Sequence, residues 1–176
     1  TFQHNKPVES MSVRENVMVG MHSRMPSSLW QILAGTGSSA SAEREAAAKA
    51  DALVDFVGLS EFRDADVATL SFGQGRLLEI ARALAAEPRL MLFDEPAAGL
   101  TAPECRRLEE IVRTIAKRGI SVLLIEHDMR FLMSLADRVA VLNFGRKIAD
   151  DTAAEVQRHP EVVQAYLGNL KDLQNA

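Results

Sequence analysis

The chain has 176 residues, of which 47% are hydrophobic and 25% charged, and its formal net charge is -4. This is the composition of an ordinary globular protein, and its acidic balance argues against a nucleic-acid binder, which usually presents a basic face. A single cysteine, Cys105, rules out an internal disulfide, and the lack of a leader pattern or a long apolar run predicts no direct membrane insertion.

The first part of the chain predicts two helices with a loop of small residues before the second. Residues 12–20 suit a short helix opened by a serine cap. Residues 35–42 carry no apolar period and predict a loop, because their likeness to a phosphate-binding loop lacks the necessary lysine. Residues 43–57 place apolar side chains on one face and end at Gly58, which predicts an amphipathic helix.

From Leu70 onward, helices alternate with short, wholly apolar strands. This pattern is typical of an α/β fold with a parallel sheet covered on both faces. The predicted elements are a helix over 71–85, a strand over 90–94, a helix over 104–117, a strand over 120–126, a hairpin over 138–143 and 146–149, and short helices over 153–158 and 161–167.

A serine and a glutamine three residues apart, Ser71 and Gln74, form a capping-box pattern at the start of one helix. A helix start presents unpaired amides and the positive end of the helix dipole, and Gly73 would let a phosphate approach the backbone closely. Alone, such a pattern is usually a plain helix cap. The motif that follows it along the chain favours a phosphate site.

Two carboxylates, Asp94 and Glu95, follow an apolar strand, and open α/β sheets bind their ligands at the carboxyl ends of strands. Asp94 would hold Mg²⁺, directly or through water, and Glu95 would orient or deprotonate an attacking water. The alternative is a strand that ends in two solvated acids before a turn. Together with the capped helix, the pair predicts ATP hydrolysis.

His127 follows the second apolar strand, so we expect it at the same rim of the sheet, where its imidazole could contact a γ-phosphate. A histidine with a purely structural role is the alternative. Gln3 has no interpretation from its chemistry alone. The sequence contains no G-x-x-x-x-G-K-[ST] loop, the element that cradles the β- and γ-phosphates in P-loop ATPases.

In this order, the motifs resemble the nucleotide-binding domain of ABC transporters. The resemblance implies an incomplete P-loop NTPase-like core with a mainly parallel sheet, plus an α-helical subdomain. It makes 70–74 the signature loop, 90–95 Walker B, 97–101 the D-loop, His127 the switch histidine and 1–3 the Q-loop. It divides the chain into the Q-loop end of the core (1–11), the helical subdomain (12–69), the catalytic core (70–150) and C-terminal helices (151–176).

The resemblance also assigns roles around ATP and Mg²⁺. Catalytic roles fall on Glu95, His127 and Gln3, and metal-binding roles on Asp94 and Gln3. The nucleotide-binding residues are Ser71, Phe72, Gly73, Gln74 and Thr101. Phe72 stands where glycine is commoner in the family, and Thr101 stands where the broad family has aspartate. The P-loop would lie before Thr1, so we expect this chain to be inactive by itself.

The implied partners are a second ABC ATPase subunit, identical or different, and transmembrane permease subunits. The chain would then be cytoplasmic, peripheral on the inner face of a bacterial membrane, and would bind no nucleic acid. Residues 95–100 and 159–168 look most like the branched-chain amino acid importer ATPases of bacteria.

Two alternatives stay open. One is the same ATPase class with another cargo, either urea or, by export, lipopolysaccharide. The other is a truncated, non-catalytic interaction module. DNA-repair and chromosome-structuring ATPases do not fit, because they need sustained heptads. We further expect the isolated chain to self-associate, because a sheet without its P-loop strand and helix exposes an edge and apolar faces.

Overall fold

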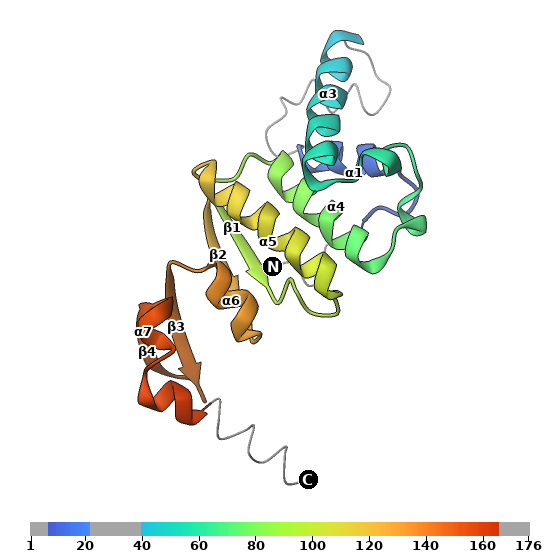
Figure 1. The fold of residues 1–176 in the computed structure, drawn as a ribbon. Helices are drawn as coiled ribbons and strands as arrows, with labels where there is room; N and C mark the ends of the chain where they lie inside the picture. The colour runs from blue at the N-terminus through green and yellow to red at the C-terminus, as the bar shows by residue number, and fades with distance from the viewer. Residues whose placement is uncertain (1–6, 22–39, 166–176) are drawn as a thin grey trace. The chain divides into compact units, whose positions relative to one another are not determined.

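The computed structural model describes residues 7–21 and 40–165 (Figure 1). The chain divides into two compact units, Thr1–Glu126 and His127–Ala176. The predicted boundaries after residues 11, 69 and 150 stay predictions. Within the described ranges, no helix combines the length and apolar character that a membrane crossing requires.

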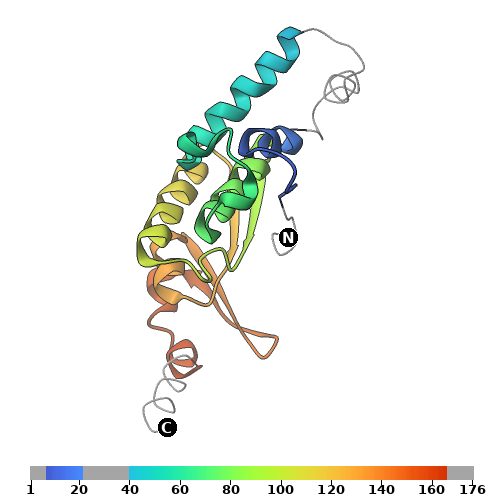
Figure 2. The same ribbon diagram turned by 90° about the vertical axis from the view of Figure 1, so that its right-hand side faces the viewer.

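Three helices pack together at the start of the first unit, as Figures 1 and 2 show. They are α1 (Val13–Gly20), α3 (Ala40–Val57) and α4 (Phe72–Ala85), with the short 3-10 turns η3 (Ser60–Phe62) and η4 (Val67–Thr69) between the last two. Their shared core is fully buried at Val13, Val17, Ala50, Val54, Leu78 and Ala81. The predicted apolar faces therefore form the core.

Glycine permits the closest helix crossing in this group. A Cβ added to Gly20 at the end of α1 would overlap the carbonyl oxygen of Arg82 in the last turn of α4. The two backbones therefore touch at this point. At the start of α3, the predicted loop is wrong over 40–42, because these residues are helical and alanine is the best helix former. Residues 35–39 lie outside the described part of the chain.

A buried amide holds the segment that leads into α1. Asn16 has no solvent exposure, and its side-chain oxygen accepts from the Val8 amide at 2.8 Å. Its side-chain nitrogen donates to the carbonyls of Val8, Met11 and Ser12. Burying an amide side chain is tolerated when its hydrogen bonds are made, and here they tie residues 8–12 to the helix.

The sheet of the first unit has two parallel strands joined by a helix. The strands β1 (Leu90–Asp94) and β2 (Ser121–Ile125) pair in register, with Leu92 opposite Leu123. The helix α5 (Ala102–Lys117) connects them and runs beside the strands in Figures 1 and 2. Its predicted stripe is buried at Leu108, Ile111, Val112 and Ile115. The predicted second strand is one residue too long at each end.

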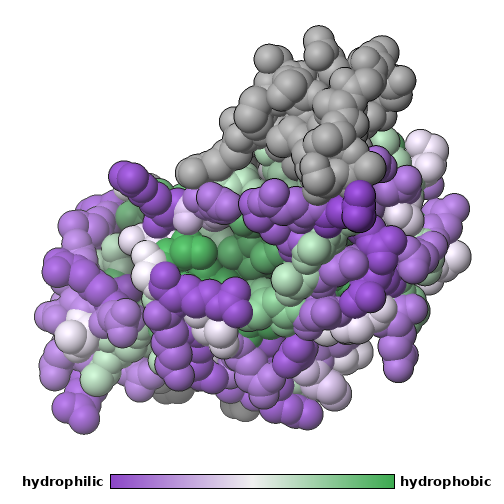
Figure 3. Space-filling model, turned by 90° about the horizontal axis from the view of Figure 1, so that it is seen from above, coloured by the Kyte–Doolittle hydropathy of each residue, from purple (hydrophilic) through white to green (hydrophobic). Residues whose placement is uncertain are grey.

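The two faces of this sheet differ in their cover. Met91 and Phe93 are only 3% and 2% exposed on one face. On the other face, Leu90, Leu92, Leu123 and Ile125 are 44–58% exposed. The described residues therefore contradict the prediction of a sheet covered on both faces, because they cover only one. Figure 3 shows, on the side it draws, a strip of hydrophobic surface bordered by hydrophilic residues.

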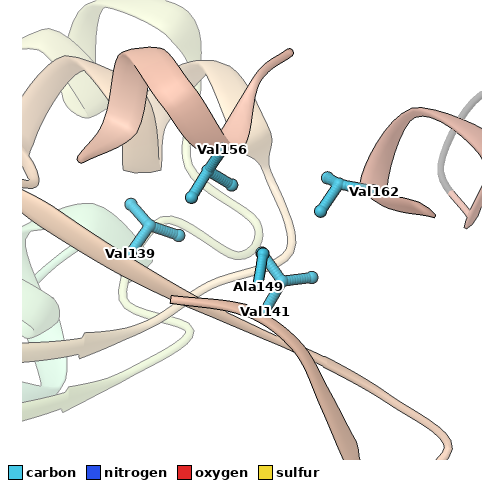
Figure 4. Close-up of a cluster of buried hydrophobic side chains, with 5 residues drawn as sticks. All are labelled: Val139, Val141, Ala149, Val156 and Val162. Carbon is cyan, nitrogen blue, oxygen red and sulfur yellow. The ribbon is translucent and has the colours of Figure 1, made fainter. Parts of the chain in front are cut away.

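The second unit is a hairpin with short helices. It contains α6 (Met129–Leu135), β3 (Arg138–Asn143), β4 (Arg146–Thr152) and α7 (Ala153–Val156), and a further helix begins at residue 160. Its small core, drawn in Figure 4, consists of Val139, Val141, Ala149, Val156 and Val162. The hairpin prediction is confirmed. However, β4 runs three residues further than expected, because residues 150–152 continue to pair with residues 138–140. α7 begins at Ala153 as predicted and ends two residues early, at Val156.

Candidate functional site

The start of α4 has the predicted reciprocal cap. The Gln74 amide donates to the Ser71 hydroxyl oxygen at 3.3 Å, and the Ser71 amide donates to Gln74 Oε1 at 2.8 Å. Helix geometry leaves four amides at a helix start without an intrahelical acceptor, and the cap uses two of them. The amides of Phe72 and Gly73 remain at the end where the helix dipole favours an anion.

Gly73 lies against a carboxylate from another helix. It is buried, and an added Cβ would overlap Glu104 Oε1. The close approach of Glu104 therefore favours glycine at this position. The predicted contact between Gly73 and a phosphate stays a prediction.

Glu104 also organises the start of α5. Its Oε2 accepts from the Thr101 hydroxyl at 2.7 Å and from the Thr101 amide at 2.8 Å. These two bonds, the hydroxyl first, lower the pKa of Glu104 below its ordinary value. Thr101 is thus the N-cap residue of α5, which begins two residues earlier than predicted. Its predicted nucleotide contact stays untested.

The aromatic side chain of Phe72 joins the start of α4 to the turn after β1. An ideal Cβ on Gly99 would lie 3.1 Å from Phe72 Cε1, and Gly99 has a φ of 78°. Both the close approach and the left-handed backbone favour glycine at this position. The Arg76 guanidinium carbon lies 5.4 Å from the centroid of the Phe72 ring, a cation–π distance. Phe72 is still 60% exposed. The predicted signature loop and D-loop therefore touch.

The carboxylate pair lies at the end of β1, as predicted. Asp94 is half-buried and pairs in register with Ile125, and the exposed Glu95 follows it. Glu95 adopts a left-handed backbone with a φ of 47°, which is unfavourable for a residue with a side chain. Its amide donates to the Ile125 carbonyl at 2.9 Å. This bond extends the pairing of the two strands by one residue and fixes where the turn begins.

A third carboxylate supports the turn from β2. The Ala97 amide donates to Glu126 Oε1 at 3.0 Å, and the Ala98 amide donates to the Glu95 carbonyl at 3.2 Å. Sequence reasoning missed both Glu104 and Glu126. Glu104 could have been found, because the T-x-x-E spacing from Thr101 is a capping pattern. Glu126 gives no such signal, because its partner is 29 residues away.

The described residues contain no group of three or more His, Cys, Asp or Glu side chains that could enclose a metal ion. Mg²⁺, however, usually takes one or two carboxylates and completes its shell with phosphates and waters. Asp94, half-buried beside Glu95 at a strand end, fits the place of such a ligand. The chemistry of this pair is therefore compatible with a metal held jointly by protein and nucleotide.

The structure does not test the roles of two predicted site residues, His127 and Gln3. His127 is exposed and is the first residue of the second unit. The next residue, Asp128, caps α6 by accepting from the Arg130 amide at 2.8 Å and the Phe131 amide at 3.2 Å. Gln3 lies outside the described residues. The roles of both stay predictions.

Comparison with known families and proteins agrees with this geometry. The profile of the family described as ABC transporter matches residues 1–98. A second profile, described as branched-chain amino acid ATP-binding cassette transporter, matches residues 146–169. Among curated proteins, the chain is 36% identical over 169 residues to the high-affinity branched-chain amino acid transport ATP-binding protein LivG of Escherichia coli K12. It is 37% identical over 169 residues to BraF of Pseudomonas aeruginosa, which carries the same description.

Both alignments include 96% of this chain and 66% of the relative, so the chain spans slightly less than two thirds of these proteins. Among solved structures, the ADP conformation of MJ1267, an ATP-binding cassette of an ABC transporter, superposes with a TM-score of 0.74 at 29% identity. That match covers 94% of this chain and 66% of the other. The dimeric cassette MJ0796, bound to ADP and Pi, shares the fold with a TM-score of 0.70 at 21% identity, over 86% of this chain and 61% of its own. On its motifs, its fold and the match of a family profile to more than half of its length, the chain belongs to the ABC transporter ATPase family.

Proposed function

We propose that this chain forms most of the ATP-hydrolysing subunit of a bacterial importer for branched-chain amino acids. The observation that carries the ATPase assignment is the contact between Phe72 and Gly99, which joins the capped helix to the turn that follows Asp94 and Glu95. The cargo assignment is supported by the second family profile and by what LivG and BraF are described as transporting.

The predicted site residues have different tasks in this proposal. Asp94 holds Mg²⁺, which when bound neutralises charge on the phosphate oxygens. Glu95, exposed at the strand end, orients the attacking water and accepts its proton. The start of α4 directs the amides of Phe72 and Gly73 towards the nucleotide of a second subunit. Gln3 and His127 contact the metal and the γ-phosphate on their own side.

The pattern G-x-x-x-x-G-K-[ST] does not occur among the 176 residues, and in this proposal another segment or chain supplies the loop that cradles the phosphates. ABC ATPases pair with one another and work with permease subunits. We therefore place the chain in a pair of ATPase subunits, peripheral on the cytoplasmic side of the membrane. ATP binding closes the pair and hydrolysis opens it, which drives the permease between its two orientations.

Replacing the proposed base tests this assignment. In the assembled transporter, Glu95→Gln should lower ATP turnover by about 10²–10⁴-fold, because general base catalysis contributes roughly that factor. Bound ATP should then persist, as a filter assay with labelled nucleotide would show. The control is Glu109→Gln, on the outer part of α5, where Glu109 pairs with Arg113. Unchanged turnover in Glu95→Gln would refute the assignment.

Cargo is tested separately. Leucine, isoleucine or valine, delivered by its binding protein to the transporter in proteoliposomes, should raise ATP turnover and accumulate inside. Stimulation by urea, or an effect confined to lipopolysaccharide export, would leave the ATPase in place and replace the cargo.

A second candidate is a non-catalytic module that pairs with an intact ATPase. Calorimetry of the 176-residue chain with Mg-ATP separates the two. Micromolar affinity would mean that these residues form a working nucleotide site by themselves. Absence of binding, together with activity only in the presence of an intact ATPase, would support the module.

A further inference from the structure

The turn that carries Glu95 is held by two consecutive residues at the end of β2. On one side of Glu95, its own amide donates to the Ile125 carbonyl at 2.9 Å. On the other side, Pro96 has no N–H group, so the next backbone donor is Ala97. That amide donates to Glu126 Oε1 at 3.0 Å. The amide of the proposed base and the next backbone amide after it therefore donate to Ile125 and Glu126, two consecutive residues.

This support matters because the Glu95 backbone is unfavourable. A left-handed residue that is not glycine persists only when its surroundings hold it. The Glu95 side chain starts from this left-handed residue, so a shift of the turn also moves its carboxylate. If the Ala97 amide loses its acceptor, the turn can relax and the carboxylate can move away from the water that it has to orient.

We infer that Glu126 is a positioning residue for Glu95, acting through the Ala97 amide. The inference rests on the proposed function, in which Glu95 is the base. Glu126 needs no contact with nucleotide in this role. What it supplies is an acceptor oxygen, and its half-buried side chain reaches across from the neighbouring strand to supply it.

Two variants distinguish whether Glu126 acts as a hydrogen-bond acceptor or through its negative charge. Glu126→Gln keeps an oxygen of the same reach and removes the charge, whereas Glu126→Ala removes both. We expect Glu126→Ala to lower kcat by about 10–100-fold with the KM for ATP changed by less than about 2-fold, because small displacements of a catalytic group cost rate and spare ground-state binding. Glu126→Gln should recover kcat to within about 3-fold of the parent.

The experiment uses the gene product in its assembled transporter. It measures kcat and KM for the parent, Glu126→Ala, Glu126→Gln and the matched control Glu109→Ala, which removes a half-buried glutamate from α5. Amide hydrogen exchange of residues 94–101 gives a second readout. Exchange at Ala97 should be at least about 10-fold faster in Glu126→Ala than in the parent or the control, because the amide has lost its acceptor.

Each outcome decides one point. Reduced kcat, unchanged KM, recovery with glutamine and faster exchange at Ala97 together support the inference. Parental kcat in Glu126→Ala overturns it and leaves the ATPase assignment intact. Equal loss in the glutamine and alanine variants also overturns it, because the charge would then be what matters. A parent transporter without ATP turnover would instead refute the proposed function, and this inference with it.

Discussion

The two faces of the β1–β2 sheet are made by the same strands and have opposite surroundings. Met91 and Phe93 point under the helices and are almost fully buried, whereas Leu92 and Leu123 on the opposite face are 44% and 54% exposed. Successive residues of a strand alternate between faces, so a shift of one residue separates core from surface. Composition alone cannot distinguish the faces, because both are apolar.

The difference shows that the described residues cover one apolar face of the sheet and leave the other apolar face exposed. Wholly apolar strands are typical of sheets with cover on both sides. The part of the chain that the structure describes places α5 beside one face. The other face remains available to a further segment or to another chain. The following predictions test this contrast between covered and open surface.

The largest effect is expected from Phe93→Ala. Removing a buried aromatic side chain leaves a cavity under the helices and should lower the free energy of unfolding by about 3–5 kcal/mol. Leu92→Ala, one residue away on the open face, should cost less than about 1 kcal/mol. Urea denaturation of both variants measures the difference. Equal losses would mean that something else covers the second face.

A similar contrast exists at the scale of a single methyl group. Gly73→Ala would drive a Cβ into the Glu104 carboxylate, which would have to swing away and give up its hydrogen bonds to Thr101, so the variant should cost about 0.5–2 kcal/mol. Gly75→Ala, in the same helix with nothing within 4 Å of its Cβ position, should instead stabilise by about 0.5–1 kcal/mol. Thermal unfolding of the two variants gives the signs. A stabilising Gly73→Ala would contradict the close approach of Glu104.

Association of the isolated chain should depend on the open face. Leu123→Lys places a charge among the exposed aliphatic side chains, so sedimentation velocity should show less oligomer than in the parent. The control is Leu142→Lys, which changes a leucine in the second unit that is at least as exposed. If both variants associate as the parent does, association does not use this face.

The smallest effect is expected at an exposed site, where ion pairs and not burial stabilise the fold. Arg138 and Lys147 hydrogen-bond to Asp150 at 2.8 and 2.7 Å and lower its pKa from 3.8 to about 2. Because the folded pKa is the lower one, this stabilisation is present above pH 3.8 and is lost as the pH falls towards about 2. NMR titration of the Asp150 carboxyl should show this midpoint, and Arg138→Ala should raise it. An unchanged midpoint would contradict the pairing.

Local chemistry explains which features could be predicted. The buried stripe of α5 follows from helical spacing, and the start of α4 follows from the spacing of Ser71 and Gln74. The end of β1 at Asp94 follows from an apolar run that stops at two acids. Each of these signals is contained within one element of the chain.

The contacts that shape the site could not be found in this way. Glu126 reaches Ala97 only because Asp94 pairs with Ile125, and the register of β1 against β2 cannot be read from the sequence. Phe72 reaches Gly99 only because α4 and the turn after β1 approach each other. Such contacts depend on the packing of whole elements, and a propensity or a spacing does not encode them.

The crossing of Gly20 over the Arg82 carbonyl has a mechanical consequence. α4 carries Ser71 at one end and this crossing near the other, about 16 Å away at 1.5 Å per residue. A glycine that lets two backbones touch leaves no side chain to absorb a displacement between them. We therefore expect a displacement of α1 to move α4 at this crossing, and α4 to carry part of that displacement to Ser71 at its other end.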